Sequence, residues 1–296
     1  MFRFQNEQKI LDIGGVNFGG QPGERRTVII GSLFYPSHSM VSNRRIGEID
    51  EERLDEVLGK LHSSAEETGT PAAIMVYGET GEAISNYLRI LSERTSLPLF
   101  IDSSSPDVRL SGVKSASEMG ILDRVIYNSI NSGTTEKELE GIQEYGLRNA
   151  VLLAFSPKDF GLKGKIYLLE DGGGILKNGL VDLADRYGID RPLLDLAVMS
   201  MEQRAGSALR AIFVSKAKWG LPSGCALHNA VESWAPLANV KAQEPALYRY
   251  VDEAACSAAI MAGADFLMFG PLEASRRVIY AATFTDELMH QASLDG

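Results

Sequence analysis

Short apolar runs that end abruptly at small polar or acidic residues recur eight times along this chain. In a chain where such runs alternate with helical patterns, each run is typical of a parallel strand that is buried on both faces. The pattern therefore predicts an α/β fold whose chemistry lies at the C-terminal ends of the strands. The runs are VIIGSLF, AAIMVYG, PLFIDSS, RVIYNSI, AVLLAFS, PLLDLAV, a weaker GLPSGCALHN, and FLMFGP.

Between the runs, apolar residues recur at i, i+3, i+4 and i+7, which is the spacing of a helix with one buried face. Thr135 and Glu138 fit a capping box, so a helix is predicted to start there and to end near Gly146. A further helix is predicted over residues 250–261. The clearest examples of the spacing are Leu54, Val57, Leu58 and Leu61, and then Ile84, Tyr87, Leu88 and Leu91.

Eight strands that alternate with helices, without a Pro/Gly/Ser-rich linker to divide them, favour a closed (β/α)₈ TIM barrel over an open doubly wound sheet. We expect one domain over residues 1–296, with a short N-terminal hairpin in FRFQNEQKILDIGGVNFGG that plugs the bottom of the barrel. Pro222 and two glycines break up the seventh run, so a seven-stranded or open sheet remains an alternative. Residues 156–176 and 200–218 are expected to form long loops on the C-terminal rim.

Composition excludes several partner classes. The chain has 39 Asp and Glu against 29 Lys and Arg, a formal net charge of -10, which would repel a nucleic-acid backbone. No apolar stretch approaches the roughly 20 residues that span a bilayer, so no transmembrane segment is expected. Two cysteines are too few for a disulfide framework, and the N-terminus lacks the apolar core of a signal peptide, so we expect a cytoplasmic protein.

Three polar residues stand where apolar runs end, and together they suggest a binding site. If Asp102, Asn128 and Asp195 all project over one barrel mouth, they offer two carboxylate acceptors and one amide that both donates and accepts. Such a set suits a flat heterocycle with N–H and amide edges, such as a pterin or a purine, better than a phosphate. Taken singly, each carboxylate could equally cap a helix or bind within a turn.

Further polar residues near the strand ends extend this candidate site. Cys225 and His228 have the two-residue gap of many zinc ligands, but one pair is half a metal site, so we expect no bound metal. The motifs of serine hydrolases, P-loop proteins and zinc proteases are missing from the sequence. The additional candidates are Glu79, Ser103, Asn131, His228 and Asn229.

The segments GGVNFGGQPGE, IGSLFY, FIDSSS, VIYNSIN, LLDLAV and FGPLE follow one another in this order. With them, the chain resembles the family of the tetrahydromethanopterin S-methyltransferase MtrH subunit, from about Val16 to Glu273, and its bacterial methylcorrinoid:tetrahydrofolate methyltransferase-like members. The resemblance implies a pterin-binding barrel, usually a homodimer, that moves a methyl group between a corrinoid protein and N5 of a tetrahydropterin. It implies that Asp102, Asn128 and Asp195 bind the pterin.

The bacterial members imply tetrahydrofolate as the methyl acceptor, so that the products are methyltetrahydrofolate and a Co(I) corrinoid. The cobalamin would arrive on a partner protein, and the methyl group would come from glycine betaine or a related methylated compound. The resemblance places Asn229 near N5, where it is our candidate hydrogen-bond donor, and Asp195 is the second residue to which we give a catalytic role.

Three alternatives remain open at this point. The pterin could be tetrahydromethanopterin, which shares the same ring edge with tetrahydrofolate. The barrel could catalyse a dihydropteroate-synthase-like condensation, with Lys216 and Lys218 forming a basic pocket for pyrophosphate. Finally, the chain could be a non-catalytic component that only binds a corrinoid protein.

Overall fold

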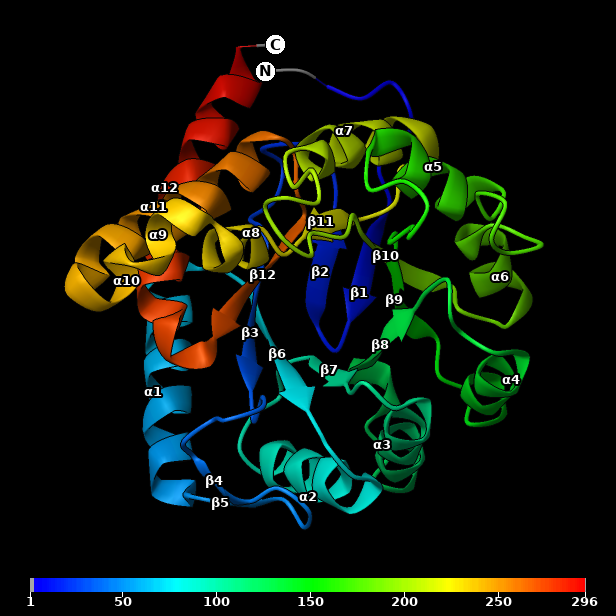
Figure 1. Cartoon of the computed structure of the whole chain (residues 1–296), viewed down its shortest axis with the longest axis vertical. Coiled ribbons are helices and arrows are strands. Elements are labelled where there is room, and N and C mark those ends of the chain that lie inside the picture. The colour runs from blue at the N-terminus through cyan, green and yellow to red at the C-terminus, as the bar shows by residue number, and fades with distance from the viewer. Residues whose placement is uncertain (1–2, 296) are drawn as a thin grey trace.

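Eight parallel strands close into a barrel at the centre of the computed structural model (Figure 1). Each strand pairs with the next one in the sequence, and the last pairs with the first, so the predicted TIM barrel is confirmed. The structure describes residues 3–295; residues 1, 2 and 296, which the predicted domain includes, lie outside this range. The barrel strands are β3 (Val28–Leu33), β6 (Ala72–Tyr77), β7 (Leu99–Asp102), β8 (Val125–Ile130), β9 (Asn149–Leu153), β10 (Arg191–Asp195), β11 (Ser223–Cys225) and β12 (Phe266–Pro271).

Helices surround the barrel and cover its outer face (Figure 1). The two predicted apolar stripes are confirmed, since all eight of their residues are buried on α1 and α2. The small β4–β5 ribbon lies between β3 and α1 in the chain. The helices are α1 (Glu51–Thr68), α2 (Gly81–Ser92), α3 (Pro106–Glu118), α4 (Glu136–Glu144), α5 (Leu162–Glu170), α6 (Leu180–Arg186), α7 (Ser207–Trp219), α8 (His228–Ser233), α9 (Ala235–Ala238), α10 (Val240–Gln243), α11 (Pro245–Met261) and α12 (Ser275–Leu294); the ribbon strands are β4 (Val41–Asn43) and β5 (Glu48–Ile49).

The N-terminal hairpin closes one end of the barrel, as predicted. Strands β1 (Ile10–Ile13) and β2 (Val16–Gly19) pair antiparallel. Phe18 is fully buried, and its ring centroid lies 6.4 Å from that of Phe100 and 6.3 Å from that of Phe266. Because Phe266 begins β12, the hairpin fills the N-terminal end of the barrel with apolar side chains and leaves the other end open for a site.

The seventh strand is short but completes the barrel. β11 has three residues and pairs with β10 on one side and β12 on the other. Its first residue, Ser223, donates its N–H to Asp265 Oδ2 at 2.8 Å, and its Oγ lies 2.9 Å from Ser215 Oγ on α7. The first bond satisfies a backbone N–H that a longer strand could pair with its neighbour, and the second ties the strand to α7.

The two predicted long loops are wrong, because each contains a helix. Residues 156–176 include α5, and residues 200–218 include most of α7. Helix α5 buries Gly164 and Lys165 beside its leucines, which disrupts the apolar periodicity by which a helix is recognised. Gly172, Gly173 and Gly174 all have positive φ and turn the chain between α5 and α6.

Thr135 caps α4 as predicted, since its Oγ1 accepts the backbone N–H of Glu138. The Glu138 side chain bonds to Arg109 instead of the cap, so only one half of the capping box forms. Helix α11 begins at Pro245, before the predicted start. Within residues 3–295, no helix combines the length and the apolar character needed to cross a membrane.

Candidate active site

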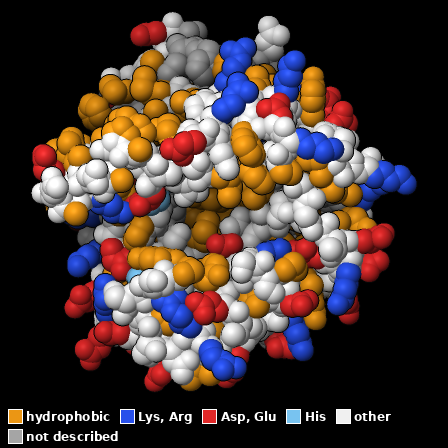
Figure 2. Space-filling model, viewed as in Figure 1, with side chains coloured by type: hydrophobic (Ala, Val, Ile, Leu, Met, Phe, Trp, Pro, Cys, Tyr) orange, Lys and Arg blue, Asp and Glu red, His pale blue; other side chains and the backbone are white. Residues whose placement is uncertain are grey.

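A cavity of about 340 Å³ lies at the C-terminal end of the barrel. Asp102 ends β7, Asn128 lies in β8 and Asp195 ends β10, and all three line this cavity. Figure 2 shows the surface hollowed near the centre of the view, over the barrel. The volume is in the range of small-molecule sites. The other lining residues are Ser32, Met75, Ser129, Leu153, Val198, Met199, Ala226, His228, Asn229, Met268 and Gly270.

Asp102 is supported by a buried arginine on α3. Burial raises the pKa of Asp102 to about 6, although the positive charge of Arg109 and hydrogen bonds from Ser103 and Asn128 act in the opposite direction. Arg109 Nη1 donates to the carbonyl oxygen of Ser103 at 2.5 Å, directly after Asp102. This contact holds the chain where it leaves β7, and so it fixes the position of Asp102.

Arg109 is itself held by two residues of the next βα unit. Its Nη2 donates to Glu138 Oε1 at 2.6 Å, and its Nε donates to Tyr127 Oη at 3.0 Å. Tyr127 also hydrogen-bonds to Glu138 and directly precedes Asn128. The ends of β7 and β8 are therefore joined beneath the cavity by one buried ionic network. Sequence reasoning missed Arg109, and it assigned Glu138 only to the capping box of α4.

Asp195 is 6% exposed, and its side chain bonds to the backbone two residues further along the chain. Its Oδ1 accepts the N–H of Ala197 at 2.9 Å, while Lys165 Nζ on α5 donates to the carbonyl oxygen of Ala197 at 2.6 Å. These two bonds hold Ala197 at φ 36°, a conformation that non-glycine residues rarely adopt. Burial raises the pKa of Asp195 to about 6, against the Ala197 N–H and the charge of Lys165.

Burial lowers the pKa of the Lys165 ammonium, while the negative charge of Asp195 opposes the shift. Sequence reasoning also did not identify Lys165 as a residue that supports the site. Among residues 3–295, the hydrogen bond of the Asp195 carboxylate is made by Oδ1, and Oδ2 has no such partner. It is the oxygen that the site can offer to a ligand.

Two consecutive residues of α8 complete the polar lining. Asn229 Nδ2 donates to the carbonyl oxygen of Val198 at 2.8 Å, which links α8 to the segment after β10. His228 Nδ1 lies 2.8 Å from Asp252 Oδ1 on α11. The Asn128–Ser129 peptide bond is cis, and Asn128 Nδ2 lies 3.9 Å from Met75 Sδ.

Three of the predicted site residues lie outside the cavity lining. Glu79 forms an ion pair with Arg44 at 3.1 Å. Ser103 Oγ donates to the carbonyl oxygen of Gly78 at 2.7 Å, and Asn131 Oδ1 accepts the N–H of Gly133 at 2.8 Å. These bonds hold the turns around the site.

The lysines invoked for a pyrophosphate pocket do not reach the cavity. Lys216 is buried at the N-terminal end of the barrel, where it pairs with Asp265 and donates to the carbonyl oxygen of Gly20 at 3.0 Å. Lys218 pairs with Glu170. The predicted pocket is therefore wrong, because α7 runs away from the C-terminal rim and carries both lysines with it. No Lys or Arg is among the residues that line the cavity.

Cys225 and His228, the pair with the spacing of zinc ligands, differ in their surroundings. Cys225 is fully buried, and burial strongly raises the pKa of its thiol, while the His228 ring is bonded to Asp252. Within the described part of the chain, no three His, Cys, Asp or Glu residues are grouped so that they could hold a metal ion.

The cavity lining contains both polar and apolar side chains, and this combination fits a flat polar ring. Carboxylates, amides and one imidazole provide acceptors and donors, whereas Met75, Leu153, Val198 and Met268 provide apolar surface. A ring bound here could place its polar edge against the strand ends and its faces against the apolar side chains.

Known proteins resemble this chain in sequence, and solved structures resemble it in fold. The model of the family described as tetrahydromethanopterin S-methyltransferase MtrH subunit matches residues 6–295. The MtrH polypeptide of this enzyme from Methanothermobacter marburgensis is 38% identical over 295 residues, which cover 100% of this chain and 95% of the relative. The corresponding polypeptide of a putative mtx methyltransferase from Methanosarcina barkeri is 37% identical, with the same coverage.

Among solved structures, the dihydropteroate synthase of Yersinia pestis with a pterine-sulfa conjugate has a TM-score of 0.66. It covers 97% of this chain and 99% of its own, at 14% identity. The dihydropteroate synthase of Xanthomonas albilineans with 4-aminobenzoic acid has a TM-score of 0.61 at 18% identity, covering 96% and 98%. At these identities the likeness shows the fold alone.

Proposed function

The chain belongs to the tetrahydromethanopterin S-methyltransferase MtrH subunit family, and we propose that it transfers a methyl group between a corrinoid protein and N5 of tetrahydrofolate. One observation carries the proposal: Asp102, Asn128 and Asp195 converge from three strands on a cavity whose lining has no cationic side chain. A phosphate-binding site would need Lys, Arg or a glycine-rich loop. A pterin needs the acceptors that these residues offer.

In the proposed complex, Asp102 and Asp195 accept hydrogen bonds from the guanidine-like N–H groups of the pterin, and Asn128 pairs with its amide edge. Bonds to an ionised carboxylate are about twice as strong as neutral ones. Met75 and Met268 lie against the ring faces. Asn229 lies near N5, with one of its two amide N–H groups already committed to Val198.

The proposed reaction needs no nucleophile from the protein. N5 attacks the methyl carbon in line, the Co–C bond breaks, and its electron pair stays on cobalt as Co(I). The contribution of the protein is orientation, which is worth roughly 7 to 11 kcal/mol when two reactants are well aligned. Held in this cavity, N5 would face the open end of the barrel, where the corrinoid partner would approach.

Exposed apolar residues near the cavity support a docking surface for that partner. Met199, Met201 and Trp234 are exposed, and Met199 also lines the cavity. Ser233 Oγ accepts the N–H of Met201 at 2.9 Å, which holds the two segments together. Methionines adapt to the shape of a transient partner.

We also propose a homodimer in the cytoplasm. Tyr280, Phe284 and Leu288 form an exposed stripe at i, i+4 and i+8 on α12, with Met261 exposed on neighbouring α11. Figure 2 shows hydrophobic side chains gathered over α11 and α12 at the upper left. Both cysteines are free, which suits a reducing compartment. Sedimentation equilibrium of F284E against the natural chain tests the dimer: dissociation by F284E supports this face, and a monomeric natural chain overturns it.

Tetrahydromethanopterin is the second candidate pterin, because curated relatives at 38% identity carry it in their names. The decisive experiment mixes the pure protein with methylcobalamin and either pterin and follows the cobalamin spectrum. Formation of Co(I) with tetrahydrofolate supports the proposal, and formation only with tetrahydromethanopterin selects the alternative. Binding of a corrinoid protein without methyl transfer to either pterin would indicate a non-catalytic role. A second assay with methyl donors would test glycine betaine as the source of the methyl group.

A further inference from the structure

His228 is the one imidazole among the side chains that line the cavity. It opens α8, directly before Asn229, and its side chain is 12% exposed. The proposed binding of the pterin uses Asp102, Asn128 and Asp195, and leaves this ring without a role. Its surroundings nevertheless give it a defined orientation and a defined tautomer.

A buried carboxylate fixes the orientation of the His228 ring. Asp252 is 1% exposed; its Oδ1 lies 2.8 Å from His228 Nδ1, and its Oδ2 accepts from Arg277 Nη2 at 2.7 Å. Burial would raise the pKa of Asp252, but the hydrogen bonds and charges of His228 and Arg277 outweigh burial and lower it. Asp252 is therefore ionised and can only accept, so Nδ1 carries a proton.

With the proton on Nδ1, the neutral ring presents Nε2 as an acceptor. A Cβ atom built on Gly270 would collide with Nε2 and with both ring carbons beside it, so the ring points its tip at Gly270. Gly270 also lines the cavity and has φ +64°. Because Gly270 has no side chain, the tip of the ring can pack against its backbone, within the lining of the cavity.

Glu232 does not satisfy Nε2 in place of a ligand. Its Oε1 lies 3.7 Å from Nε2, which is beyond hydrogen-bond distance. Both oxygens of Glu232 bond to Lys241 Nζ, at 2.6 and 2.7 Å, and Oε1 also accepts from the hydroxyl of Tyr248. Nε2 thus has no hydrogen-bond partner among the described residues, on a ring that lines the cavity.

We propose that His228 Nε2 exchanges the proton of N5 during methyl transfer, an inference that rests on the proposed function. As N5 bonds to the methyl carbon and the electron pair of the Co–C bond stays on cobalt, N5 carries an excess proton, which passes to Nε2. The imidazolium then releases a proton to water. In the opposite direction, the imidazolium protonates N5 as Co(I) takes the methyl group.

Asp252 and Arg277 are positioning residues in this relay, since neither lines the cavity. Asp252 holds the tautomer, and Arg277 holds Asp252. Arg277 also bonds to Glu253 Oε1 at 3.3 Å, which fixes its side chain between α11 and α12. The charged and titratable groups that face His228 directly or through one neighbour are Asp252, Glu232, Arg277, Lys241 and Tyr248, with Asp102 and Asp195 lining the same cavity.

The test compares His228→Gln with His290→Gln. His290 is an exposed histidine at the other end of the barrel, bonded to the carbonyl oxygen of Gly23, so it controls for the loss of an imidazole. Methyl transfer from methylcobalamin to tetrahydrofolate is followed by the cobalamin spectrum across neutral pH, and pterin binding is measured separately by calorimetry. His228→Gln leaves every other charged group in place.

We expect H228Q to bind the pterin as the natural chain does but to transfer the methyl group about 100-fold more slowly. Its pH–rate profile should also differ from that of the natural chain, because the group that exchanges the proton of N5 is gone. H290Q should match the natural chain in both respects. Asp252→Asn should slow transfer less than H228Q does, because it disturbs only the tautomer. Added imidazole should restore part of the rate to His228→Ala, which a purely structural role would not allow.

An unchanged rate and pH profile in H228Q would overturn the relay while leaving the proposed function intact. Equal losses of affinity and rate, without rescue of H228A by imidazole, would make His228 a binding residue and would also overturn the relay. If the natural chain transfers no methyl group to either pterin, the proposed function itself fails, and this inference fails with it.

Discussion

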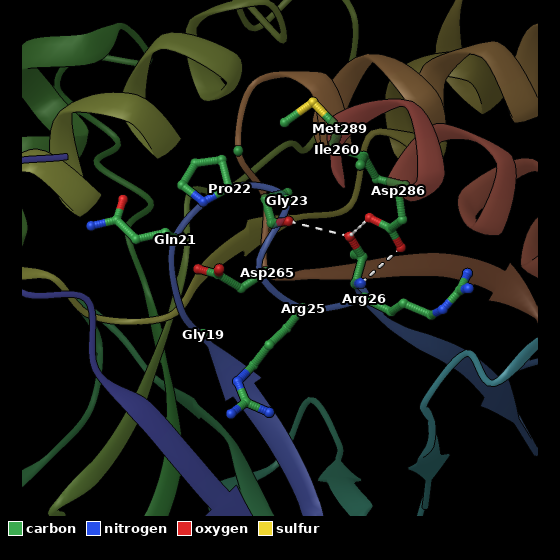
Figure 3. A pocket seen from close by; sticks show the side chains of 13 residues that line it. Gly19, Gln21, Pro22, Gly23, Arg25, Arg26, Ile260, Asp265, Asp286 and Met289 are labelled. Carbon is green, nitrogen blue, oxygen red and sulfur yellow. Dashed lines mark hydrogen bonds between the residues drawn. The ribbon is translucent and has the colours of Figure 1, made fainter. Parts of the chain in front are cut away.

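Both ends of the barrel bury a carboxyl group whose pKa is raised to about 6, Asp195 at the C-terminal end and Asp286 at the N-terminal end. Figure 3 shows Asp286 in a small cavity near Arg26, Gly23 and Met289. Its Oδ1 accepts from Thr27 Oγ1 at 2.8 Å, and its Oδ2 accepts from Thr27 N at 2.9 Å. Asp286 therefore uses both oxygens to fix the start of β3, whereas Asp195 leaves Oδ2 free.

The comparison shows that a perturbed pKa alone does not mark a functional residue. Burial raises the pKa of both groups, and both line cavities, but of the two only Asp195 leaves an oxygen without a hydrogen-bond partner among the described residues. The apolar hairpin packs the N-terminal end of the barrel, so that end contributes stability. The C-terminal end instead holds the cavity of about 340 Å³. Mutations at the two ends should separate these contributions.

The largest effect is expected at the closed end. Phe18→Ala removes a fully buried ring that contacts Phe100 and Phe266, and should lower the free energy of unfolding by about 3 to 5 kcal/mol. Urea denaturation followed by circular dichroism measures the loss. The fraction that remains folded should bind the pterin with unchanged affinity. A matching loss of affinity would mean that the hairpin also shapes the site.

The next effect is on binding at the open end. Asp195→Ala and Asn128→Ala should each weaken pterin binding by about 100-fold or more, because each removes hydrogen bonds to a buried ring edge. Calorimetric titration with tetrahydrofolate measures the affinity, and the melting temperature reports on the fold. Asp286→Ala is the matched control and should leave the affinity unchanged. Natural affinity in both site variants would refute the assigned roles.

A smaller effect concerns the pH dependence of stability without ligand. The pKa of Asp195 is higher in the folded chain, about 6, than in the unfolded chain, so its contribution to stability is complete below about pH 4 and is lost as the pH rises through 6. Asp195→Asn cannot ionise, so it removes this loss of stability at high pH. It should raise the free energy of unfolding by about 1 to 3 kcal/mol above pH 7 and have little effect near pH 4.

Urea denaturation at the two pH values measures this difference. Asp286→Asn should show the same pH dependence, since burial raises the pKa of that group as well. Only Asp195→Asn should also change pterin binding. A gain of the same size at both pH values would mean that it does not come from the ionisation of Asp195.

The fold and the three central site residues could be predicted because they depend on local pattern. Strands buried on both faces produce continuous apolar runs, and in a parallel barrel the ends of such runs meet at one rim. Asp102, Asn128 and Asp195 follow directly from that rule. The β11 strand was uncertain because Pro222 and two glycines interrupt its apolar run, and the side chains that support it, Asp265 and Ser215, lie outside that run.

The supporting residues were missed because they are charged residues on apolar helix faces. Arg109 shares the buried stripe of α3 with Gly112, Val113 and Ala116, at i, i+3, i+4 and i+7. Lys165 on α5 and Asp252 on α11 occupy equivalent buried positions. A charge on such a stripe needs a buried partner, so its position in the stripe is the signal that could have identified it. The partners themselves lie on other elements and need the structure.

The smallest effect tests whether the open end depends on a distant helix cap. Thr135→Ala removes the side-chain oxygen that accepts the Glu138 N–H at the start of α4, and should cost about 1 kcal/mol of stability. Thr135→Ser keeps the oxygen and is the control. Pterin affinity should not change in either variant, because Arg109 and Tyr127 hold the Glu138 carboxylate independently of the cap. Weaker binding in Thr135→Ala alone would show that the network beneath Asp102 requires an ordered first turn of α4, and that stability and binding are coupled at this end of the barrel.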